Sequence, residues 1–578
     1  MATQSDRPNV VFVLTDDQGY GDLGCTGNPW IQTPHIDNFY QESVRLTDYH
    51  VSPLCTPTRG ALMSGKRPVR NGAWATCWGR SILNRHDRIM PQFFQEAGYT
   101  TGMFGKWHLG DNYPYRPQDR GFQRVVAHKG GGVGQTPDFW ANNYFDDTYF
   151  HNGTPQQHEG YCTDVWFDEA LTFIEENHDR PFFAYIATNA PHSPYLVAKK
   201  YRDLYADNPD IPTPAFYGMI TNIDENFGRL RRKLAALGIE DNTILIFMTD
   251  NGSSAGARLD RDHFVTAGYN AGMRGMKGSY YDGGHRVPFF IRWPNGNIEG
   301  GRDISDLVMH IDLLPTFIDL CRLPAAGEDD FDGTSVAAAF TDPAGELPDR
   351  THFLQYRQNS TPPEKWTNAV INRRWRLVCG DELYDIKADP GQHENIASRH
   401  PDVVDRLRGE FETWWRRIEP GLQTFCPISL GNEAENPACL CAMDVMGDVA
   451  WNQCHIAAAQ RSTGRWRVNV EKAGRYRVTL RRWPEELDLA LDDTLSQEEK
   501  DKLAPYQEPD SYVCTAVKPV SARLELLGGQ WQADVTPDQK EVTFEIDIAE
   551  SGESDLDAWF AEADGRETGA YYVYVQRL

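Results

Sequence analysis

Residues 8–17 have the sequence PNVVFVLTDD, an apolar run rich in valine that ends abruptly in two aspartates. An apolar run without alternation predicts a strand that is buried on both faces, as in a parallel sheet. A second run of this kind, NTILIFMTDNG, closes at residue 252. Between them lie YTTGMFGKWHLG, RPFFAYIATNAPH and amphipathic stretches such as NIDENFGRLRRKLAALG. Strands that alternate with helices over about the first 340 residues predict an α/β fold with a large, mostly parallel sheet flanked by helices.

The pattern changes after about residue 350. WTNAVINRRWRLVCGDELYDIKADPGQHENIA predicts short strands joined by turns, and PDVVDRLRGEFETWWRRIEP predicts a helix that packs on them. From about residue 425 the chain predicts a β-rich appendage, in which two stretches alternate like strand faces and EKAGR between them is a candidate hairpin turn. The alternating residues are Trp466, Val468, Val470, Tyr476, Val478 and Leu480. We therefore expect a catalytic α/β domain at 1–345, a small antiparallel-sheet-plus-helix subdomain at 346–424 and a C-terminal extension at 425–578.

Composition limits the partners of the chain. Its 578 residues carry a formal net charge of −26, which argues against a nucleic acid or an anionic membrane as partner. MATQSDRPNV lacks the basic and apolar regions of a signal peptide, and no stretch approaches the roughly 20 apolar residues of a membrane span. We expect a soluble protein, either cytoplasmic or the mature form of a secreted or periplasmic one. Eleven cysteines are too few for a disulfide framework at this length.

Acidic side chains stand at the ends of two predicted strands. Asp16 and Asp17 end the first, and Asp250 and Asn251 end the later one. In open parallel sheets the active site forms at the carboxyl ends of the strands. Oxygen ligands without a Cys or HExxH partner favour Ca²⁺ or Mg²⁺ over Zn²⁺. Either motif alone is also a good turn sequence, but the two together favour a metal site.

Basic groups and histidines follow other strands. In GKWHLG, an extended backbone would point Lys106 and His108 to one face, where they would suit an anionic substrate that needs proton transfer. His192 lies in the proline-rich loop NAPHSP, again after a strand. The glycine-rich segment 272–288 adds four basic side chains, although such a segment alone is more often a flexible loop. They are Arg274, Lys277, His285 and Arg286. We expect Arg116 and Arg120 to be structural.

Cys55 in SPLCTPTRGALMSG stands near the predicted start of a short helix, with Pro57 as its first residue and Gly65 at its end. A helix N-terminus with Arg59 one turn inside is a site for an anion, and it would also favour a thiolate nucleophile. Metal ligation is disfavoured because no CxxC motif or His pair lies nearby.

CTPTRGALMSG resembles the C-x-P-x-R signature of the type I, formylglycine-dependent sulfatases of the alkaline phosphatase superfamily. The stretches PNVVFVLTDDQGYGDLGCTG, GKWHLG, APHSP, TDNG and MKGSYYDGGHRVP occur in that family's order. The resemblance covers about residues 8–420, including ELYDIKADPGQHENIA, and does not extend to 425–578. It implies an alkaline phosphatase-like fold.

The resemblance implies a role for ten residues. A dedicated maturation enzyme would oxidise Cys55 to formylglycine, and a divalent cation, Ca²⁺ rather than Mg²⁺, would bind Asp16, Asp17, Asp250 and Asn251. The aldehyde hydrate and the sulfate oxygens would be held by Arg59, Lys106, His108, His192 and Lys277. One hydroxyl of the hydrate would attack sulfur. His108 is the expected base for the second hydroxyl, and His192, close to Lys277, the expected donor to the leaving alcohol.

The resemblance therefore implies a sulfuric ester hydrolase, and we expect its substrate to be a sulfated carbohydrate. A formylglycine-dependent phosphonate or phosphodiester hydrolase and a non-catalytic glycan-binding relative are the alternatives. Six side chains on polar or aromatic loops are candidates for the substrate pocket. They are Trp74, Arg80, Arg258, His263, Arg357 and Trp366.

Overall fold

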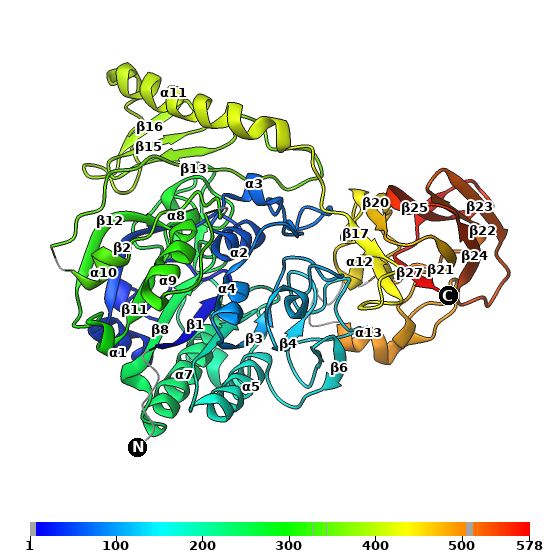
Figure 1. The fold of residues 1–578 in the computed structure, drawn as a ribbon, viewed down its shortest axis with the longest axis horizontal. Helices are drawn as coiled ribbons and strands as arrows, with labels where there is room; N and C mark the ends of the chain where they lie inside the picture. Colours follow the sequence, from blue (N-terminus) through cyan, green and yellow to red (C-terminus); the bar gives the residue numbers. More distant parts are fainter. Residues whose placement is uncertain (1–6, 328, 343, 504–512) are drawn as a thin grey trace.

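The structure is a computed structural model that describes residues 7–327, 329–342, 344–503 and 513–578. Its centre is a ten-stranded sheet (Figure 1). In spatial order the strands are β12 (Asp303–Met309), β2 (Val44–His50), β11 (Phe289–Arg292), β8 (Thr243–Thr249), β1 (Asn9–Thr15), β7 (Phe182–Ala187), β3 (Thr100–Lys106), β4 (Arg124–His128), β5 (Thr148–His151) and β6 (Thr154–Gln157). Strands β8, β1, β7, β3 and β4 are mutually parallel, whereas β11 and the β5–β6 hairpin are antiparallel to their neighbours. The predicted α/β fold with a mostly parallel sheet is confirmed.

Strand β1 is buried on both faces because helices cover both sides of the sheet. Val10 and Phe12 pack into a core with helices on one side, whereas Val11 and Val13 pack into a second core on the other. The helices of the first core are α2 (Cys55–Ser64), α4 (Met90–Glu96) and α9 (Leu313–Cys321), and those of the second are α1 (Pro34–Glu42), α5 (Cys162–Asn177) and α7 (Pro214–Ala236). The shorter elements of this region are α3 (Pro68–Asn71), α6 (Lys199–Arg202), α8 (Asp282–His285), α10 (Ala337–Thr341) and the pair β9 (Ala257–Leu259) and β10 (Val265–Gly268). Two buried faces explain the absence of polar alternation in β1.

A four-stranded antiparallel sheet follows in the chain. It comprises β13 (His352–Leu354), β14 (Ala369–Ile371), β15 (Trp375–Val378) and β16 (Glu382–Asp385). Helix α11 (Pro401–Ile418) buries Leu407, Phe411 and Trp415 in a core that also contains Leu377. The expected small sheet with one packed helix is present, and Figure 1 shows α11 running along the outside of this sheet.

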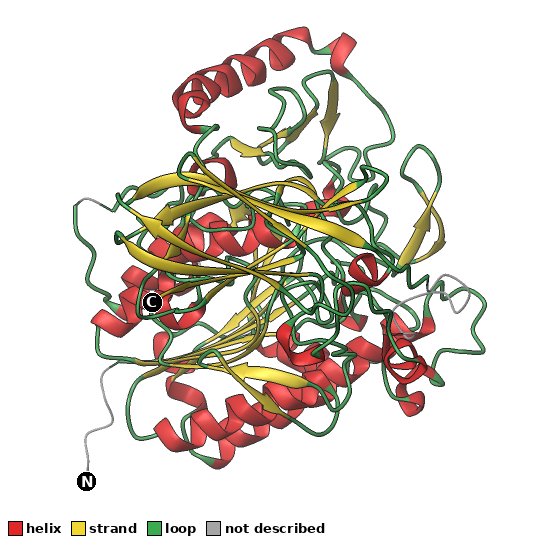
Figure 2. Ribbon diagram, turned by 90° about the vertical axis from the view of Figure 1, so that its right-hand side faces the viewer, coloured by secondary structure: helices red, strands yellow, loops and turns green. Residues whose placement is uncertain are grey.

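Two further sheets face each other in the C-terminal region (Figures 1 and 2). The larger sheet contains β17 (Ile428–Leu430), β19 (Met446–Asp448), β20 (Thr463–Val470), β22 (Pro519–Leu526), β23 (Gly529–Asp534), β25 (Gly552–Glu562) and β26 (Glu567–Gly569). The smaller contains β18 (Ala438–Cys441), β21 (Gly474–Arg481), β24 (Val542–Ile548) and β27 (Tyr572–Arg577). Helices α12 (Gln453–Ala457) and α13 (Gln497–Leu503) complete this region.

The candidate hairpin at EKAGR is wrong, although both of its strands exist. β20 pairs with β17, β19 and β25, whereas β21 pairs with β24 and β27, so the chain crosses from one sheet to the other. Trp466 and Val468 from β20 and Tyr476 and Val478 from β21 meet in one core. Each strand has one apolar face, and two such faces can be buried by facing sheets as well as by one hairpin. Alternation alone does not distinguish the two arrangements.

No helix in the described part of the chain combines the length and the apolar character that crossing a membrane requires. All eleven cysteines lie in described residues, and no disulfide joins any two of them.

Candidate active site

The carboxyl ends of four adjacent parallel strands, β8, β1, β7 and β3, bring seven of the ten predicted site residues to one edge of the sheet, whereas Cys55 and Arg59 are on α2 and Lys277 is on the loop before α8. Asp16 and Asp17 follow β1, and Asp250 follows the neighbouring β8. The backbone N–H of Asp17 donates to Oδ1 of Asp250 over 3.0 Å. Asp17 itself has a φ of 64°, a left-handed conformation that turns the chain immediately after the strand. One carboxylate oxygen from each of the three aspartates lies within 4.8 Å of the other two, and all three side chains are buried.

The donor set of this acidic cluster fits a hard divalent cation. Asp16 Oδ1 and Asn251 Oδ1 are buried oxygens without a hydrogen-bond partner. Asn251 donates through Nδ2 to Asp17 Oδ1 over 2.9 Å, which leaves its own oxygen for another ligand. Burial, followed by the charge of Asp16, raises the pKa of Asp250 to about 7. Crowded oxygens with two unpartnered acceptors are what Ca²⁺ or Mg²⁺ would satisfy.

Three cations contact the same carboxylates: Arg59 and Lys106 are buried, and Lys277 is partly exposed. Arg59 donates through Nε and Nη2 to Asp250 Oδ2, at 3.0 and 2.8 Å. Lys106 Nζ lies 2.7 Å from Asp16 Oδ2. Lys277 Nζ lies 2.6 Å from Asp17 Oδ2. Three positive charges therefore balance three carboxylates, and a divalent cation would leave the site with a positive excess that suits an anionic substrate.

Cys55 is the first residue of α2, and Gly65 ends that helix in the left-handed conformation with a φ of 65°. The helix thus begins two residues before Pro57, the expected first position, but Cys55 stands at its N-terminus as expected. All ten residues of α2 are buried. Burial raises the pKa of the Cys55 thiol, although Lys106 and Lys277 act in the opposite direction. A protonated thiol is a poor nucleophile, which disfavours direct attack by the cysteine itself.

His108 is oriented as a proton acceptor towards Cys55. Its Nε2 lies 2.9 Å from the carbonyl oxygen of Thr76, so Nε2 carries the proton and donates it. Its Nδ1 therefore presents a lone pair, and this atom lies 3.4 Å from Cys55 Sγ. Burial and Lys106 lower the pKa of His108 well below its ordinary value, which keeps the ring neutral. Gly131 packs against the ring, because a Cβ there would lie 2.2 Å from His108 Cε1.

Lys106 and His108 reach the same site for a different reason than expected. Strand β3 ends at Lys106, and His108 has a φ of 58°, so the backbone is not extended between them. Trp107 packs in the core and donates from its indole N–H to the carbonyl oxygen of Tyr115. The turn after the strand, rather than strand alternation, brings the imidazole to Cys55.

His192 and Lys277 form the opposite side of the site. Nδ1 of His192 lies 2.6 Å from the carbonyl oxygen of Ser193 and donates to it, which leaves a lone pair on Nε2. Nε2 lies 3.7 Å from Asp17 Oδ2. Burial and Lys277 lower the pKa of His192 to about 4, so its ring is neutral at neutral pH. Burial acts to lower the pKa of the Lys277 ammonium group, but Asp17, Cys55 and Asp16 together outweigh burial and raise that pKa.

Only one of the four basic side chains expected from segment 272–288 contacts the acidic cluster. Lys277 does so, whereas Arg274 packs on Tyr281 and donates to Tyr384. Arg286 donates to the carbonyl oxygen of Thr47. His285 belongs to a separate buried cluster described below. Arg116 and Arg120 are structural, as expected: Arg116 pairs with Asp119, and Arg120 donates to backbone carbonyls.

A cavity of about 330 Å³ opens above Cys55, His108, His192 and Lys277. Its remaining lining residues are Leu54, Thr76, Cys77, Trp78, Gly131, Gln135, Ser193, Gln358, Met443 and Trp451. None of these wall residues was predicted from the sequence, because the loops that carry them come together only in the folded chain. The one available signal was proximity in sequence, since Gln358 directly follows Arg357, a predicted pocket residue.

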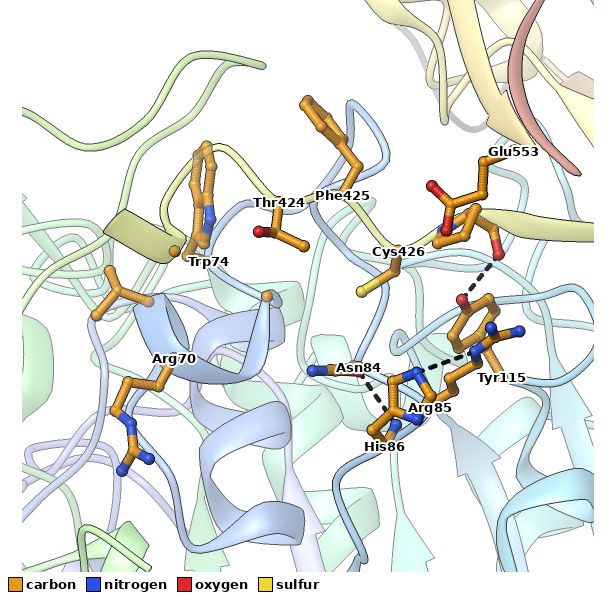
Figure 3. Close-up of a pocket in the computed structure, with 14 residues that line it drawn as sticks. Arg70, Trp74, Asn84, Arg85, His86, Tyr115, Thr424, Phe425, Cys426 and Glu553 are labelled. Atoms are coloured by element: carbon orange, nitrogen blue, oxygen red, sulfur yellow. Dashed lines mark hydrogen bonds between the residues drawn. The ribbon is translucent and has the colours of Figure 1, made fainter. Parts of the chain in front are cut away.

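None of the six predicted pocket residues lines this cavity. Arg80 is buried between the rings of Trp74 and Phe425, with its guanidinium 4.6 and 3.3 Å from their centroids. Trp74 lines a different cavity, of about 170 Å³, which Figure 3 shows beside Phe425 and Cys426. The remaining four make other contacts: Arg258 with the Pro212 carbonyl, His263 with Tyr281, Arg357 with Glu364, and Trp366 with Phe411.

A second buried cluster of histidines and acids anchors the small sheet. His50 Nδ1 lies 2.8 Å from His285 Nδ1. Arg376 on β15 donates to Asp282 over 2.8 Å and to Asp48 over 3.0 Å. Its guanidinium supplies the positive charge that a cation would otherwise bring. This cluster is therefore a structural ion-pair network that joins the four-stranded sheet to the central sheet.

The fold and the site together define a hydrolase of the alkaline phosphatase superfamily. Residues 8–323 match the family model described as Sulfatase, and residues 276–415 match that of the C-terminal part of N-sulphoglucosamine sulphohydrolase. The first match spans more than half of the chain. The chain therefore belongs to the sulfatase family, of type I, and is a sulfuric ester hydrolase.

Known relatives agree with this assignment. An arylsulfatase of Hemicentrotus pulcherrimus is 31% identical over 413 residues, which cover 67% of this chain and 71% of that protein. An ulvan-active sulfatase of Formosa agariphila is 29% identical over 456 residues, covering 72% of this chain and 80% of the relative. The crystal structure of Ps i-CgsB in complex with k-i-k-neocarrahexaose superimposes with a TM-score of 0.63 at 27% identity, and covers 71% of this chain and 93% of that one.

Proposed function

We propose that this chain hydrolyses sulfate monoesters of carbohydrates. The reaction would use a formylglycine made from Cys55 by a maturation enzyme, and a divalent cation, Ca²⁺ in preference to Mg²⁺. The cation would be held by Asp16, Asp17, Asp250 and Asn251. Support for a carbohydrate comes from the relatives, one of which is named as ulvan-active while another was solved with a neocarrahexaose.

The observation that carries the proposal is the position of Cys55. The residue starts a buried helix, and its Sγ lies 3.4 Å from Nδ1 of His108. Its own thiol is protonated, since burial raises its pKa. An encoded cysteine that is a poor nucleophile, placed opposite a competent base, supports a role as precursor of another group.

The two groups would add what the side chains lack. Formylglycine at position 55, as an aldehyde hydrate, would supply a nucleophilic hydroxyl for sulfur and a second, ionisable hydroxyl for release of sulfate. A bound Ca²⁺ supplies positive charge next to the sulfate oxygens.

The chain's own residues would hold the anion and move the protons. Lys106 and Arg59 fix two carboxylates of the acidic cluster, and Lys277 faces the cavity above them. His108 Nδ1 is placed to accept a proton from the group at position 55. Lys277 holds a proton at neutral pH, whereas neutral His192 presents a lone pair at Nε2. We therefore assign proton donation to the leaving alcohol to Lys277, in place of His192, which was expected from the sequence as the donor and whose ring is neutral.

Relative turnover tests the reaction class. Purified protein coexpressed with a formylglycine-generating enzyme is assayed with an aryl sulfate, an aryl phosphodiester and monosulfated sugars such as N-acetylgalactosamine 6-sulfate. We expect sulfate esters to be hydrolysed with the higher kcat/KM. A preference for the phosphodiester would contradict the proposal, and binding of sulfated sugars without turnover of any ester would indicate a non-catalytic relative.

A further inference from the structure

The C-terminal region contributes to the wall of the active-site cavity. Met443 and Trp451 line the same cavity as Cys55 and Lys277, although the matched family models end at residue 415. Both residues lie in the segment between β18 and α12, and Figure 1 shows α12 on the side of the C-terminal region that is nearest the central sheet. This segment, residues 442–452, is called the rim segment below.

The rim segment is tied to the catalytic region by backbone hydrogen bonds. Trp78 donates from its N–H to the carbonyl oxygen of Met443 over 3.0 Å. Thr136 donates in the same way to Trp451 over 3.1 Å. Gln453, immediately after the segment, donates through Nε2 to the carbonyl oxygens of Gln135 and Asp138, each at 3.2 Å. These bonds fix the rim segment against the loops that form the rest of the cavity wall.

Trp451 has the properties of a stacking surface. Its side chain is 39% exposed, and it is the one aromatic residue among the exposed large hydrophobic residues of the described chain. His455 stands edge-on to it, with ring centroids 4.8 Å apart and an interplanar angle of 87°, which sets the orientation of the indole. A large, partly exposed aromatic ring that lines a cavity and is held in place indicates contact with a ligand.

The other wall residues indicate which ligand. Apart from Lys277 and the two histidines, the described lining residues carry no charged side chain. Gln358 and Gln135 present amides, and both are oriented by hydrogen bonds, to Thr76 and Gly131 respectively. Amides suit hydroxyl groups, and an indole suits the C–H face of a pyranose ring. A volume of about 330 Å³ is at the lower end for ligand pockets, so the space fits a single ring better than an extended chain.

We infer that Trp451 is the stacking platform for the sugar ring that carries the sulfate, and that the C-terminal region thereby selects a neutral pyranose with one sulfate group. This inference rests on the proposed function, since it concerns the leaving group of that reaction. Trp451 is a specificity residue in this account, because it touches the ring and not the sulfate.

The test compares a sugar sulfate with inorganic sulfate. Inorganic sulfate has no sugar ring, so it would bind beside the acidic cluster and Lys277 and would not contact Trp451. Trp451→Ala, Trp451→Phe and wild type are assayed for KM with N-acetylgalactosamine 6-sulfate and galactose 6-sulfate, and for the inhibition constant of sulfate. Trp559→Ala is the matched control, because that tryptophan is in the same C-terminal region, on β25, and does not line the cavity.

We expect Trp451→Ala to raise KM for the sugar sulfates about 3- to 10-fold, the equivalent of one lost aromatic contact. The inhibition constant of sulfate should stay within about 2-fold, Trp451→Phe should recover most of the loss, and Trp559→Ala should match wild type. Equal losses for sugar sulfate and sulfate, or no change in KM, would overturn the inference. If the proposed function itself is wrong, wild type will hydrolyse neither sugar sulfate. That result differs from both outcomes above, and it would overturn the inference as well.

Discussion

The acidic edge of the central sheet and the wall of the cavity above it differ in how the sequence encodes them. At the edge, Asp16, Lys106 and Asp250 each stand at or directly after a strand, so their positions follow from the strands that carry them. In the wall, Thr76, Gln358 and Trp451 come from three loops that are far apart in the chain. The contrast teaches that catalytic residues placed by the ends of strands can be predicted from the sequence. Residues that contact the substrate from several separate loops cannot.

The largest effect should come from the nucleophile position. Cys55→Ala removes the precursor of the attacking group, so we expect kcat for an aryl sulfate to fall on the order of 10⁶-fold. Binding of sulfate should persist, because the acidic cluster and its cations are unchanged. Steady-state kinetics and sulfate titration measure both. Residual turnover near wild type would break the assignment of the edge as the catalytic region.

Removal of the base should cost less. His108→Ala should lower kcat about 10²- to 10⁴-fold. A base acts in its neutral form, and burial lowers the pKa of His108 well below 6.5. The acid limb of the wild-type kcat/KM profile should therefore lie below pH 6.5, with activity lost as the pH falls through the lowered pKa. An acid limb at or above pH 6.5 would contradict this role.

Loss of a side chain that binds the divalent cation should lower activity and abolish the stabilisation of the fold by Ca²⁺. Asp16→Asn should reduce kcat about 10²-fold or more. Added Ca²⁺ should raise the Tm of chelator-treated wild type, since it binds only the folded chain, and should not raise that of the variant. Asp319→Asn on the exposed face of α9 is the matched control. A Ca²⁺-induced rise in Tm that is equal in the variant would place the cation elsewhere.

The smallest effect on catalysis should come from the anchor of the small sheet. Arg376→Met leaves Asp48 and Asp282 buried without their partner, so we expect it to lower the free energy of unfolding by about 3–5 kcal/mol. KM for sugar sulfates should change little, because Arg376 does not line the cavity. Arg374→Met is the control, because its side chain is 59% exposed and pairs at the surface. Denaturant unfolding distinguishes the two, and equal stabilities would remove the anchoring role.

The sequence predicted the edge because short-range rules are sufficient there. The uninterrupted apolar runs of β1 and β8 indicate burial on both faces, and polar residues directly after them must emerge at the same edge. Even there, the local backbone conformation was not predicted. The sequence suggested an extended backbone from Lys106 to His108, but His108 reaches Cys55 through a left-handed turn.

The sequence did not predict the wall or the pairing of the C-terminal strands. β20 and β21 each show one apolar face, and this pattern fits a hairpin and two facing sheets equally well. Trp451 carries no local signal at all, because its exposure near Cys55 depends on hydrogen bonds from Trp78 and Thr136, which lie over 300 residues earlier in the chain. Trp74 and Trp366, chosen for their residue type, pack elsewhere.

Mass spectrometry of the peptide Leu46–Arg59 tests the central claim most directly. Protein made with and without a formylglycine-generating enzyme is digested with trypsin, and the fraction of aldehyde at position 55 is compared with turnover of an aryl sulfate. The account predicts that kcat rises in proportion to the aldehyde fraction and vanishes with it. Full turnover by protein whose Cys55 is entirely an unmodified thiol would contradict the account.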